Sequence, residues 1–307
     1  MSPAGTPGDG TGVRVGVDIG GTKILAGVVG SEGRVVDSEG RETPHRTAPA
    51  DVVEGLIADA VAALQHRHAV EAVGIAAAGF VDAAGSRVMF APHLSWRDEP
   101  LRDRLGARLG LPVTVANDAN AALWAEHVHG RARGARDVVM VTLGTGIGGA
   151  LMIDGRLHVG RNGMAGEFGH IRVVPDGRPC ECGHTGCWEQ YCSGKALARF
   201  AADAGSPLSG PALTEAAERR DPVARGAYLE VGRWLGTGLA DLVAGFDPEL
   251  VLVGGGVSAA GELLLEPARR ALHEALVGSG HRSEPELSVA TLGPYAGLVG
   301  AAELTRL

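Results

Sequence analysis

The sequence predicts an α/β fold built from two related domains that face each other across a central cleft. The main observation is that residues 13–42 and 137–160 share one plan of strand, glycine-containing turn, strand, second turn and third strand. Two copies of one supersecondary unit indicate two similar domains. The chain has 307 residues, 45% of them hydrophobic, which is enough to build a core in each domain.

The composition favours small-molecule chemistry over binding to large anionic partners. The formal net charge is −8, whereas nucleic acid or an anionic membrane surface requires a basic face. No apolar run approaches the roughly 20 residues of a membrane span. No signal peptide is recognised, so we expect a reducing, cytoplasmic location. The 48 glycines cluster in loops after apolar runs, which suggests backbone that approaches a ligand closely.

The first half of the chain predicts alternating strands and helices. Residues 1–12 offer nothing to bury and are expected to be a disordered tail. Residues 13–42 predict three antiparallel strands, and a helix is expected at about 52–66. A buried strand follows and ends at Gly79, and residues 101–109 have a helical pattern.

The remaining elements follow from the same patterns. They are a strand at 112–118, a helix that begins at Asn117 or Asp118, the second three-strand unit at 137–160 with an Asp154-Gly155 hairpin turn, helices between about 194 and 244, a strand, glycine turn and helix at 249–276, and a short helix within 294–307 that can return to the first domain.

All four cysteines fall between Cys180 and Cys192, just after a histidine that ends the string GEFGH. Zinc prefers four nitrogen or sulfur ligands in a tetrahedron, and Gly183 and Gly186 let the loop fold tightly. The predicted ligands are His170, Cys180, Cys182 and Cys187. Disulfides or unrelated buried thiols are the alternatives. A site with four protein ligands is closed, so its expected role is structural.

Cys192 is not expected to join this set. It lies in what is predicted as the start of a helix, WEQYCSGKALARF, where an offset of five residues from Cys187 points it to another face.

Two glycine loops are candidate phosphate-binding sites. Residues 144–149 match G-x-G-x-x-G, but a hairpin follows where the dinucleotide motif needs a helix. GVDIGGTK likewise has the wrong order for a Walker A loop. Successive backbone N–H groups in a glycine turn nevertheless bind anions. The candidate residues are Gly20, Gly21, Thr22 and Lys23 in one loop and Thr145 and Gly146 in the other.

Either loop alone is also compatible with a plain tight hairpin. Two such loops, one from each domain, suit a nucleoside triphosphate between them. Asp18, beside the first loop, is positioned to hold Mg²⁺, and we expect it to do so through water; its alternative role is that of a turn residue. Gly254, Gly255 and Gly256 form a third glycine turn, where a helix N-terminus can meet the nucleotide.

Four strings together resemble a known family. They are VGVDIGGTKILAGVV, NDAN, VTLGTGIGGALMIDGRLHVGRNGMAGEFGHI and CECGHTGCWEQY. The chain is similar through nearly all of its length after residue 12 to the ROK family of sugar kinases and transcriptional repressors, and most of all to its bacterial glucokinases. The most specific part is E-x-G-H followed by C-x-C-G-x-x-G-C-x-E.

This resemblance implies the actin-like ATPase (ribonuclease H-like) fold, duplicated, with ATP and Mg²⁺ at the hinge and a hexose in the cleft. We expect a small domain of residues 13–117 plus 291–307 and a large domain of residues 118–290 that includes the zinc loop 170–187. The resemblance also implies zinc on the Cys₃His set, with Cys192 free, and a homodimer or higher homo-oligomer.

Asp118 is the implied catalytic base. A carboxylate at a helix N-terminus is favoured as the ionised form, and phosphoryl transfer depends mostly on positioning and charge neutralisation. Without the surrounding motifs, Asn117 and Asp118 would be a mere capping pair. The residues expected to bind the sugar are Gly79, Asn117, Asp118, Glu167, His170 and Glu189. The two glutamates alone would pass as solvated surface carboxylates. Zinc on one nitrogen of His170 would leave the other nitrogen for a sugar hydroxyl.

The predicted activity is ATP-dependent phosphorylation of glucose to glucose 6-phosphate. A kinase for N-acetylmannosamine, N-acetylglucosamine or fructose is the near alternative, because the same motifs serve each sugar. One departure is His93, where the family string A-P-N-L usually has Asn. A DNA-binding repressor would need a helix-turn-helix module, for which residues 1–12 are too short. A sugar sensor without catalysis is disfavoured by the presence of Asp18, Asp118 and both loops.

Overall fold

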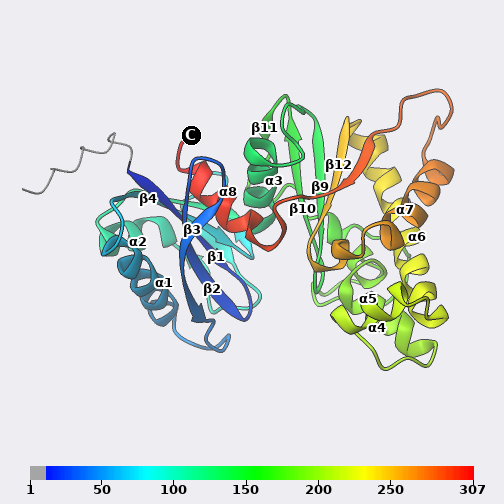
Figure 1. Ribbon diagram of the computed structural model, residues 1–307, viewed down its shortest axis with the longest axis horizontal. Coiled ribbons are helices and arrows are strands. Elements are labelled where there is room, and N and C mark those ends of the chain that lie inside the picture. The colour runs from blue at the N-terminus through cyan, green and yellow to red at the C-terminus, as the bar shows by residue number, and fades with distance from the viewer. Residues whose placement is uncertain (1–11) are drawn as a thin grey trace, which may run out of the picture.

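The computed structural model describes residues 12–307 and shows two lobes, each built on a five-stranded sheet (Figure 1). The predicted tail lies almost entirely outside the described residues. The first sheet consists, in spatial order, of β3 (Val35–Glu42), β2 (Lys23–Val29), β1 (Val13–Ile19), β4 (Val70–Ala77) and β8 (Val113–Asn117). The second consists of β11 (Arg156–Leu157), β10 (Ile147–Ile153), β9 (Val138–Leu143), β12 (Leu250–Gly254) and β13 (Glu286–Val289).

The two sheets have the same topology. In each, the first three strands are antiparallel, the fourth pairs in parallel with the first, and the fifth pairs in parallel with the fourth. The strand β11 is only two residues long, whereas its counterpart β3 has eight. The repeated unit that the sequence predicted is therefore confirmed, together with the duplicated α/β fold.

Helices and a small sheet complete the first lobe. They are α1 (Ala50–Gln65), α2 (Leu101–Leu109), β5 (Phe80–Val81), β6 (Val88–Phe90) and β7 (Arg97–Glu99). Ile57, Leu64 and Trp96 are fully buried against the apolar face of the main sheet. The strand expected to end at Gly79 stops at Ala77, because the chain leaves the main sheet there and Phe80 begins the small one.

The second lobe carries most of the helices. They are α4 (Gly194–Asp203), α5 (Gly210–Glu218), α6 (Pro222–Phe246) and α7 (Glu262–Ala275), with the 3₁₀ turns η1 (Phe168–His170), η2 (Trp188–Gln190) and η3 (Gly256–Ala260). Trp188 and Tyr228 are almost completely buried in this core. The Trp188 indole Nε1 donates to the carbonyl oxygen of Trp234 on α6 at 2.8 Å, so η2 is fixed to the longest helix.

Two helices, α3 (Asp118–His129) and α8 (Ala296–Leu304), join the lobes. The 3₁₀ turn η4 (Gly293–Tyr295) leads into α8, which packs on β1, β4 and α3 (Figure 1). The approach is so close that an added Cβ would collide with backbone: at Gly16 with Leu298, at Gly74 with Ala301, and at Gly300 with Ala121. Only glycine, which has no Cβ, fits at these three positions, so α8 packs directly on the first sheet and on α3.

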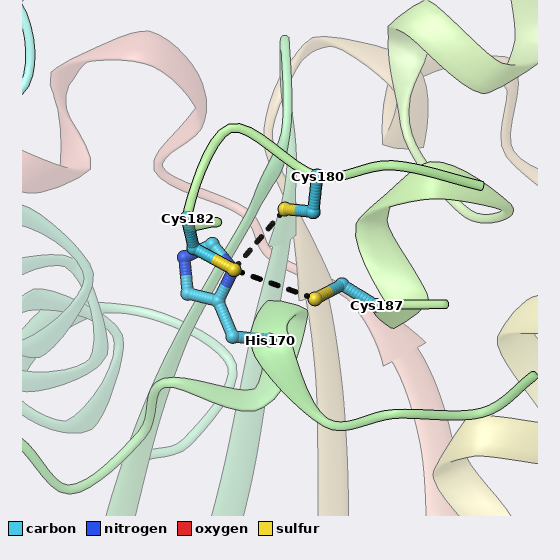
Figure 2. A group of neighbouring side chains, drawn as sticks. All are labelled: His170, Cys180, Cys182 and Cys187. Carbon is cyan, nitrogen blue, oxygen red and sulfur yellow. Dashed lines mark hydrogen bonds between the residues drawn. The ribbon is translucent and has the colours of Figure 1, made fainter. Parts of the chain in front are cut away.

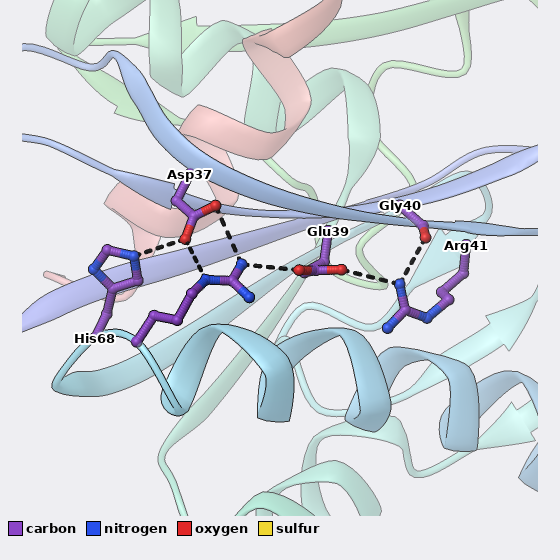
Figure 3. Close-up of polar contacts among 6 residues, drawn as sticks. Asp37, Glu39, Gly40, Arg41 and His68 are labelled. Carbon is purple, nitrogen blue, oxygen red and sulfur yellow. Dashed lines mark hydrogen bonds and ion pairs between the residues drawn. The ribbon is translucent and has the colours of Figure 1, made fainter.

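A row of charged side chains lies on β3, an edge strand of the first sheet. Arg67 donates to Asp37 through Nε at 2.8 Å and to Glu39 through Nη2 at 2.8 Å, and His68 Nε2 lies 2.8 Å from Asp37 (Figure 3). Arg41 Nη1 continues the row to Glu39. The Arg67 guanidinium lowers the pKa of Asp37 to about 2. Charged residues on an edge strand discourage pairing with another chain.

The helices of residues 12–307 include none long and apolar enough to cross a membrane. The longest, α6, has exposed Arg225 and Arg233 among its 25 residues.

The glycine contact between α3 and α8 gives a stability prediction. Gly300→Ala should lower the free energy of unfolding by about 1–3 kcal/mol, because the new methyl group overlaps the Ala121 carbonyl. Gly226→Ala is the matched control: it also lies inside a helix, but an added Cβ would meet nothing within 4 Å. That substitution should stabilise by about 0.5–1 kcal/mol. Denaturant unfolding measures both, and equal effects would contradict the close contact.

Candidate active site and metal cluster

The junction between β8 and α3 holds the predicted catalytic pair. Asn117 caps the helix: its Oδ1 accepts from the N–H of Ala119 at 2.9 Å and of Asn120 at 3.1 Å. Its Nδ2 donates to the carbonyl oxygen of Gly79 at 3.1 Å. The capping role considered from the sequence is therefore real for Asn117. The Asn117 side chain therefore caps α3 and holds the Gly79 carbonyl beside the start of that helix.

Asp118 occupies the first turn of α3, where its Oδ1 accepts from the Ala119 N–H at 2.9 Å. Burial raises the pKa of this carboxyl, and the backbone N–H groups and Asn117 act in the opposite direction. The helix N-terminus was expected to favour ionisation, but burial is the larger effect. A general base works best with a pKa nearer to the operating pH, so the shift suits proton abstraction.

Asp18 lies near Asp118 although it comes from β1. Burial raises the pKa of Asp18 to about 6, and the Asp118 charge contributes. The position of an added Cβ at Gly297, in the first turn of α8, is 3.3 Å from Asp18 Oδ1. Two half-buried acidic groups on separate elements thus lie near each other, an arrangement that favours a cation.

Glu167 and Glu189 extend this acidic group towards the cysteines. Burial, with the charges of Asp118 and Glu189, raises the pKa of Glu167 to about 7. Glu189 Oε1 accepts from the Cys180 thiol at 3.1 Å and lies 4.0 Å from His170 Nδ1. The two glutamates are therefore not the solvated surface carboxylates that either would suggest alone.

The four predicted zinc ligands converge (Figure 2). Their ligand atoms all lie within 4.8 Å of one another. Cys180 Sγ is 3.8 Å from His170 Nδ1, and Cys182 Sγ is 3.6 Å from Cys187 Sγ. Sulfurs bound to zinc at about 2.3 Å in a tetrahedron lie roughly 3.7–3.8 Å apart. The donor types and spacings therefore fit Zn²⁺.

The backbone of the cysteine loop is shaped by two glycines, as the sequence predicted. Gly183 has φ +91° and Gly186 has φ +76°, and a Cβ on Gly186 would collide with the Val174 carbonyl. Isolated bridges pair Arg172 with Cys187 and Pro179 with Thr185. These two bridges close the loop at both ends.

Cys192 lies apart from the cluster, but not in a helix. It precedes α4, which begins at Gly194 after the capping residue Ser193. Its side chain is fully buried in the core of the second lobe. The predicted helix start was therefore too early, because a capping serine ends the irregular segment.

The predicted phosphate loops lie in corresponding turns of the two sheets. The loop after β1 contains Gly20, Gly21 and Thr22, and Lys23 begins β2; the loop after β9 contains Thr145 and Gly146. Lys23, Thr22 and Thr145 are exposed. A Cβ on Gly146 would overlap Glu189 Oε2, so the second loop passes directly by the acidic group.

The third glycine turn joins the second loop, but no α-helix begins there. A Cβ on Gly255 would collide with the Leu143 carbonyl beside Gly144, and Gly255 has φ +80°. Gly254 ends β12, and Gly256 begins the short η3, whereas α7 starts at Glu262. The predicted helix N-terminus is therefore a single 3₁₀ turn, because the positive φ of Gly261 separates η3 from α7.

Some neighbours of this site were not predicted. Gly297 approaches Asp18, and Glu126 is buried beneath the crossing to α8. His93, noted only as a departure from a motif, has its ring 3.5 Å from an added Cβ at Gly21. A lone Glu or Gly in a helix gives no sequence signal of such contacts.

Known proteins share this architecture. A glucokinase from Streptomyces coelicolor is 48% identical over 96% of this chain and 98% of its own length. The crystal structure of a ROK family glucokinase from Streptomyces griseus in complex with glucose and AMPPNP is 49% identical, covers 96% of this chain and 99% of that one, and has a TM-score of 0.87. The ROK hexokinase from Thermus thermophilus is 36% identical over 96% of this chain and all of that one, with a TM-score of 0.78.

The fold is accordingly the duplicated two-domain, actin-like ATPase fold that the resemblance implied. The family model for ROK proteins matches residues 14–307, which is the whole chain apart from its first 13 residues. With this match and relatives of this identity, the chain belongs to the ROK family.

Proposed function

We propose that this chain is an ATP-dependent hexose kinase that converts glucose to glucose 6-phosphate. The observation that carries the proposal is the pair of enclosed carboxylates, Asp18 on β1 and Asp118 on α3, between two sheets with corresponding glycine turns. The likeness to a glucokinase solved with glucose and AMPPNP supports it.

In the proposed reaction, Asp118 accepts the proton of the sugar hydroxyl as that oxygen bonds to the terminal phosphorus of ATP. The bond from this phosphorus to the bridging oxygen breaks, and ADP leaves. The raised pKa of Asp118 makes it a better proton acceptor than an exposed aspartate. Gly79, Asn117, Glu167, His170 and Glu189 are the proposed partners of the other hydroxyls. A carboxyl with a pKa of about 7, as in Glu167, can act as donor or acceptor near neutral pH.

The glycine turns are the proposed nucleotide site. Gly20, Gly21, Thr22 and Lys23 would contact phosphate from one lobe, and Thr145, Gly146, Gly254, Gly255 and Gly256 from the other. Bound Mg²⁺ would neutralise phosphate charge during transfer. Asp18 is the proposed group that holds it, through water, since no salt bridge joins this carboxyl to a basic side chain within residues 12–307.

We also propose Zn²⁺ on His170, Cys180, Cys182 and Cys187. Burial raises the pKa of the Cys180 thiol, and a bound cation favours the thiolate. Because Nδ1 of His170 faces the sulfurs, Nε2 is free for a sugar hydroxyl. The ion would then hold His170 and Glu189 in fixed relation.

A kinase for another hexose, such as N-acetylmannosamine, N-acetylglucosamine or fructose, is the second candidate. His93 favours it, because an imidazole beside the Gly20–Thr22 turn differs from the amide usual in the family motif. The domain limits stay proposals at residues 13–117 with 291–307 and at 118–290. A homodimer or higher homo-oligomer and a cytoplasmic location, which suits free thiols, are proposed with them.

A coupled assay of ADP release with a panel of hexoses tests the activity. Glucose should give the highest kcat/KM, and Asp118→Ala should lower kcat by about 10²–10⁴-fold while glucose still binds. Asp59→Ala, at an exposed position on α1, is the control and should leave kcat unchanged. An active Asp118→Ala enzyme would rule out the base, and preference for another sugar would favour the second candidate.

Metal analysis tests the zinc cluster. Cys182→Ser should release zinc and weaken glucose binding, because one tetrahedral ligand is lost and His170 is no longer fixed. Cys192→Ala removes a cysteine from the same stretch without touching the cluster, so it should keep its zinc. Full zinc occupancy in the Cys182 variant would remove this residue from the ligand set.

The negative charge of Asp18 should lower the free energy of unfolding in the absence of ligands. Its pKa is about 6 in the folded protein and 3.8 in the unfolded chain, so the folded state binds more protons and loses stability as the pH rises from about 4 to 6. Asp18→Asn should therefore stabilise the free protein by about 1–3 kcal/mol at pH 7.5, and by less at pH 5. Thermal unfolding at both pH values measures this, with Asp59→Asn as control. A destabilised Asp18→Asn protein at pH 7.5 would contradict the enclosure of this charge.

A further inference from the structure

Glu126 lies two turns after Asp118 on α3, and its side chain is fully buried. Its Oε1 accepts from the N–H groups of Thr291 and Leu292, both at 2.7 Å. Its Oε2 accepts from the Thr291 hydroxyl at 2.9 Å and from the Arg131 N–H at 2.8 Å. The four donors are neutral, so hydrogen bonds to backbone and hydroxyl stabilise this buried charge.

Three of the four donors belong to the segment that returns the chain to the first lobe. Thr291 and Leu292 follow β13 of the second sheet and precede η4 and α8. The other passage between the sheets is the junction of β8 with α3, where Asp118 lies. One helix therefore carries Asp118 at its first turn and holds the second passage through Glu126.

The returning segment also leads to Asp18. Gly297, five residues after Leu292, approaches Asp18 Oδ1, and Gly300 lies against the Ala121 carbonyl of α3. Gly297 and Gly300 both lie on α8, so a shift of α8 relative to α3 moves the backbone beside Asp18 relative to Asp118. The Glu126 hydrogen bonds fix the residues just before η4, which leads into that helix.

We propose that Glu126 is a positioning residue, whose carboxylate clamps Thr291 and Leu292 to α3 and thereby sets the separation of Asp18 and Asp118 in phosphoryl transfer. This inference rests on the proposed kinase function. Misplacement of reacting groups by about 1 Å can cost 10²-fold in rate, so a clamp outside the substrate site can control kcat. Glu126 itself touches no substrate.

Glu126→Gln tests the clamp at constant size. The amide has one acceptor oxygen, and its NH₂ group would face donors, so at least two hydrogen bonds are lost. We expect kcat to fall about 10–100-fold with KM for glucose within about threefold. Hydrogen exchange of a peptide covering residues 290–295 should become faster. Glu54→Gln is the control: it removes another buried carboxylate, which lies on α1 and pairs with Arg104 away from α3 and α8, and it should leave kcat unchanged.

Coupling to Asp18 separates positioning from general destabilisation. If Glu126 acts through the location of Asp18, Glu126→Gln should cost less than about threefold in kcat when Asp18→Asn is already present. An equal loss in both backgrounds would overturn the proposal. A normal kcat in Glu126→Gln, with exchange at residues 290–295 accelerated, would overturn it too, and so would unchanged exchange.

A second pair of variants serves if Glu126→Gln does not fold. Thr291→Val removes the hydroxyl donor at nearly constant volume, and Thr291→Ser keeps it. We expect kcat to fall about 3–10-fold in the first and to stay within twofold in the second; full activity of Thr291→Val would contradict the clamp. A wild-type chain inactive on every hexose would contradict the proposed function instead, and the exchange data would still judge the clamp.

Discussion

The structure depends on the close packing of α8 on the backbone of β1, β4 and α3. Gly16 on β1, Gly74 on β4 and Gly300 on α8 itself leave no room for a Cβ, so the last helix touches the first sheet and α3 without intervening side chains. Such a contact tolerates sliding poorly, because backbone atoms meet backbone atoms. Because α3 also packs on β9 and β10 of the second sheet, this contact helps to fix the position of one lobe relative to the other.

The acidic residues at the junction are arranged for ligands rather than for stability. Asp18, Asp118 and Glu167 all have raised pKa values with burial as the main cause, and neighbouring carboxylates raise the pKa of Asp18 and Glu167 further. An enclosed cluster of like charges is unfavourable in the free protein and favourable once a cation and hydroxyl donors enter. Stability is thus sacrificed locally at the site where chemistry is proposed, and the two cores compensate for it.

The cysteine loop performs a different task from the acidic residues it borders. Its glycines and bridges shape the loop so that the four ligand atoms lie close together. Glu189 follows Cys187 by two residues and reaches both Cys180 and the turn at Gly146. A structural ion here would fix His170, a proposed ligand, and Glu189, which is two residues from the ligand Cys187. A closed metal site could in this way affect substrate binding.

The sequence by itself determined what is local or repeated. The cysteine spacing with its glycines predicted the cluster, the duplicated strand and turn pattern predicted two sheets of one topology, and Asn117 predicted the start of α3. Tertiary structure alone decided that Asp18 lies near Asp118, that Gly297 approaches Asp18, and that Glu126 holds Thr291 and Leu292. The reason is physical. Periodicity and spacing report on neighbours along the chain, whereas these contacts join residues up to 279 positions apart, which no local pattern records.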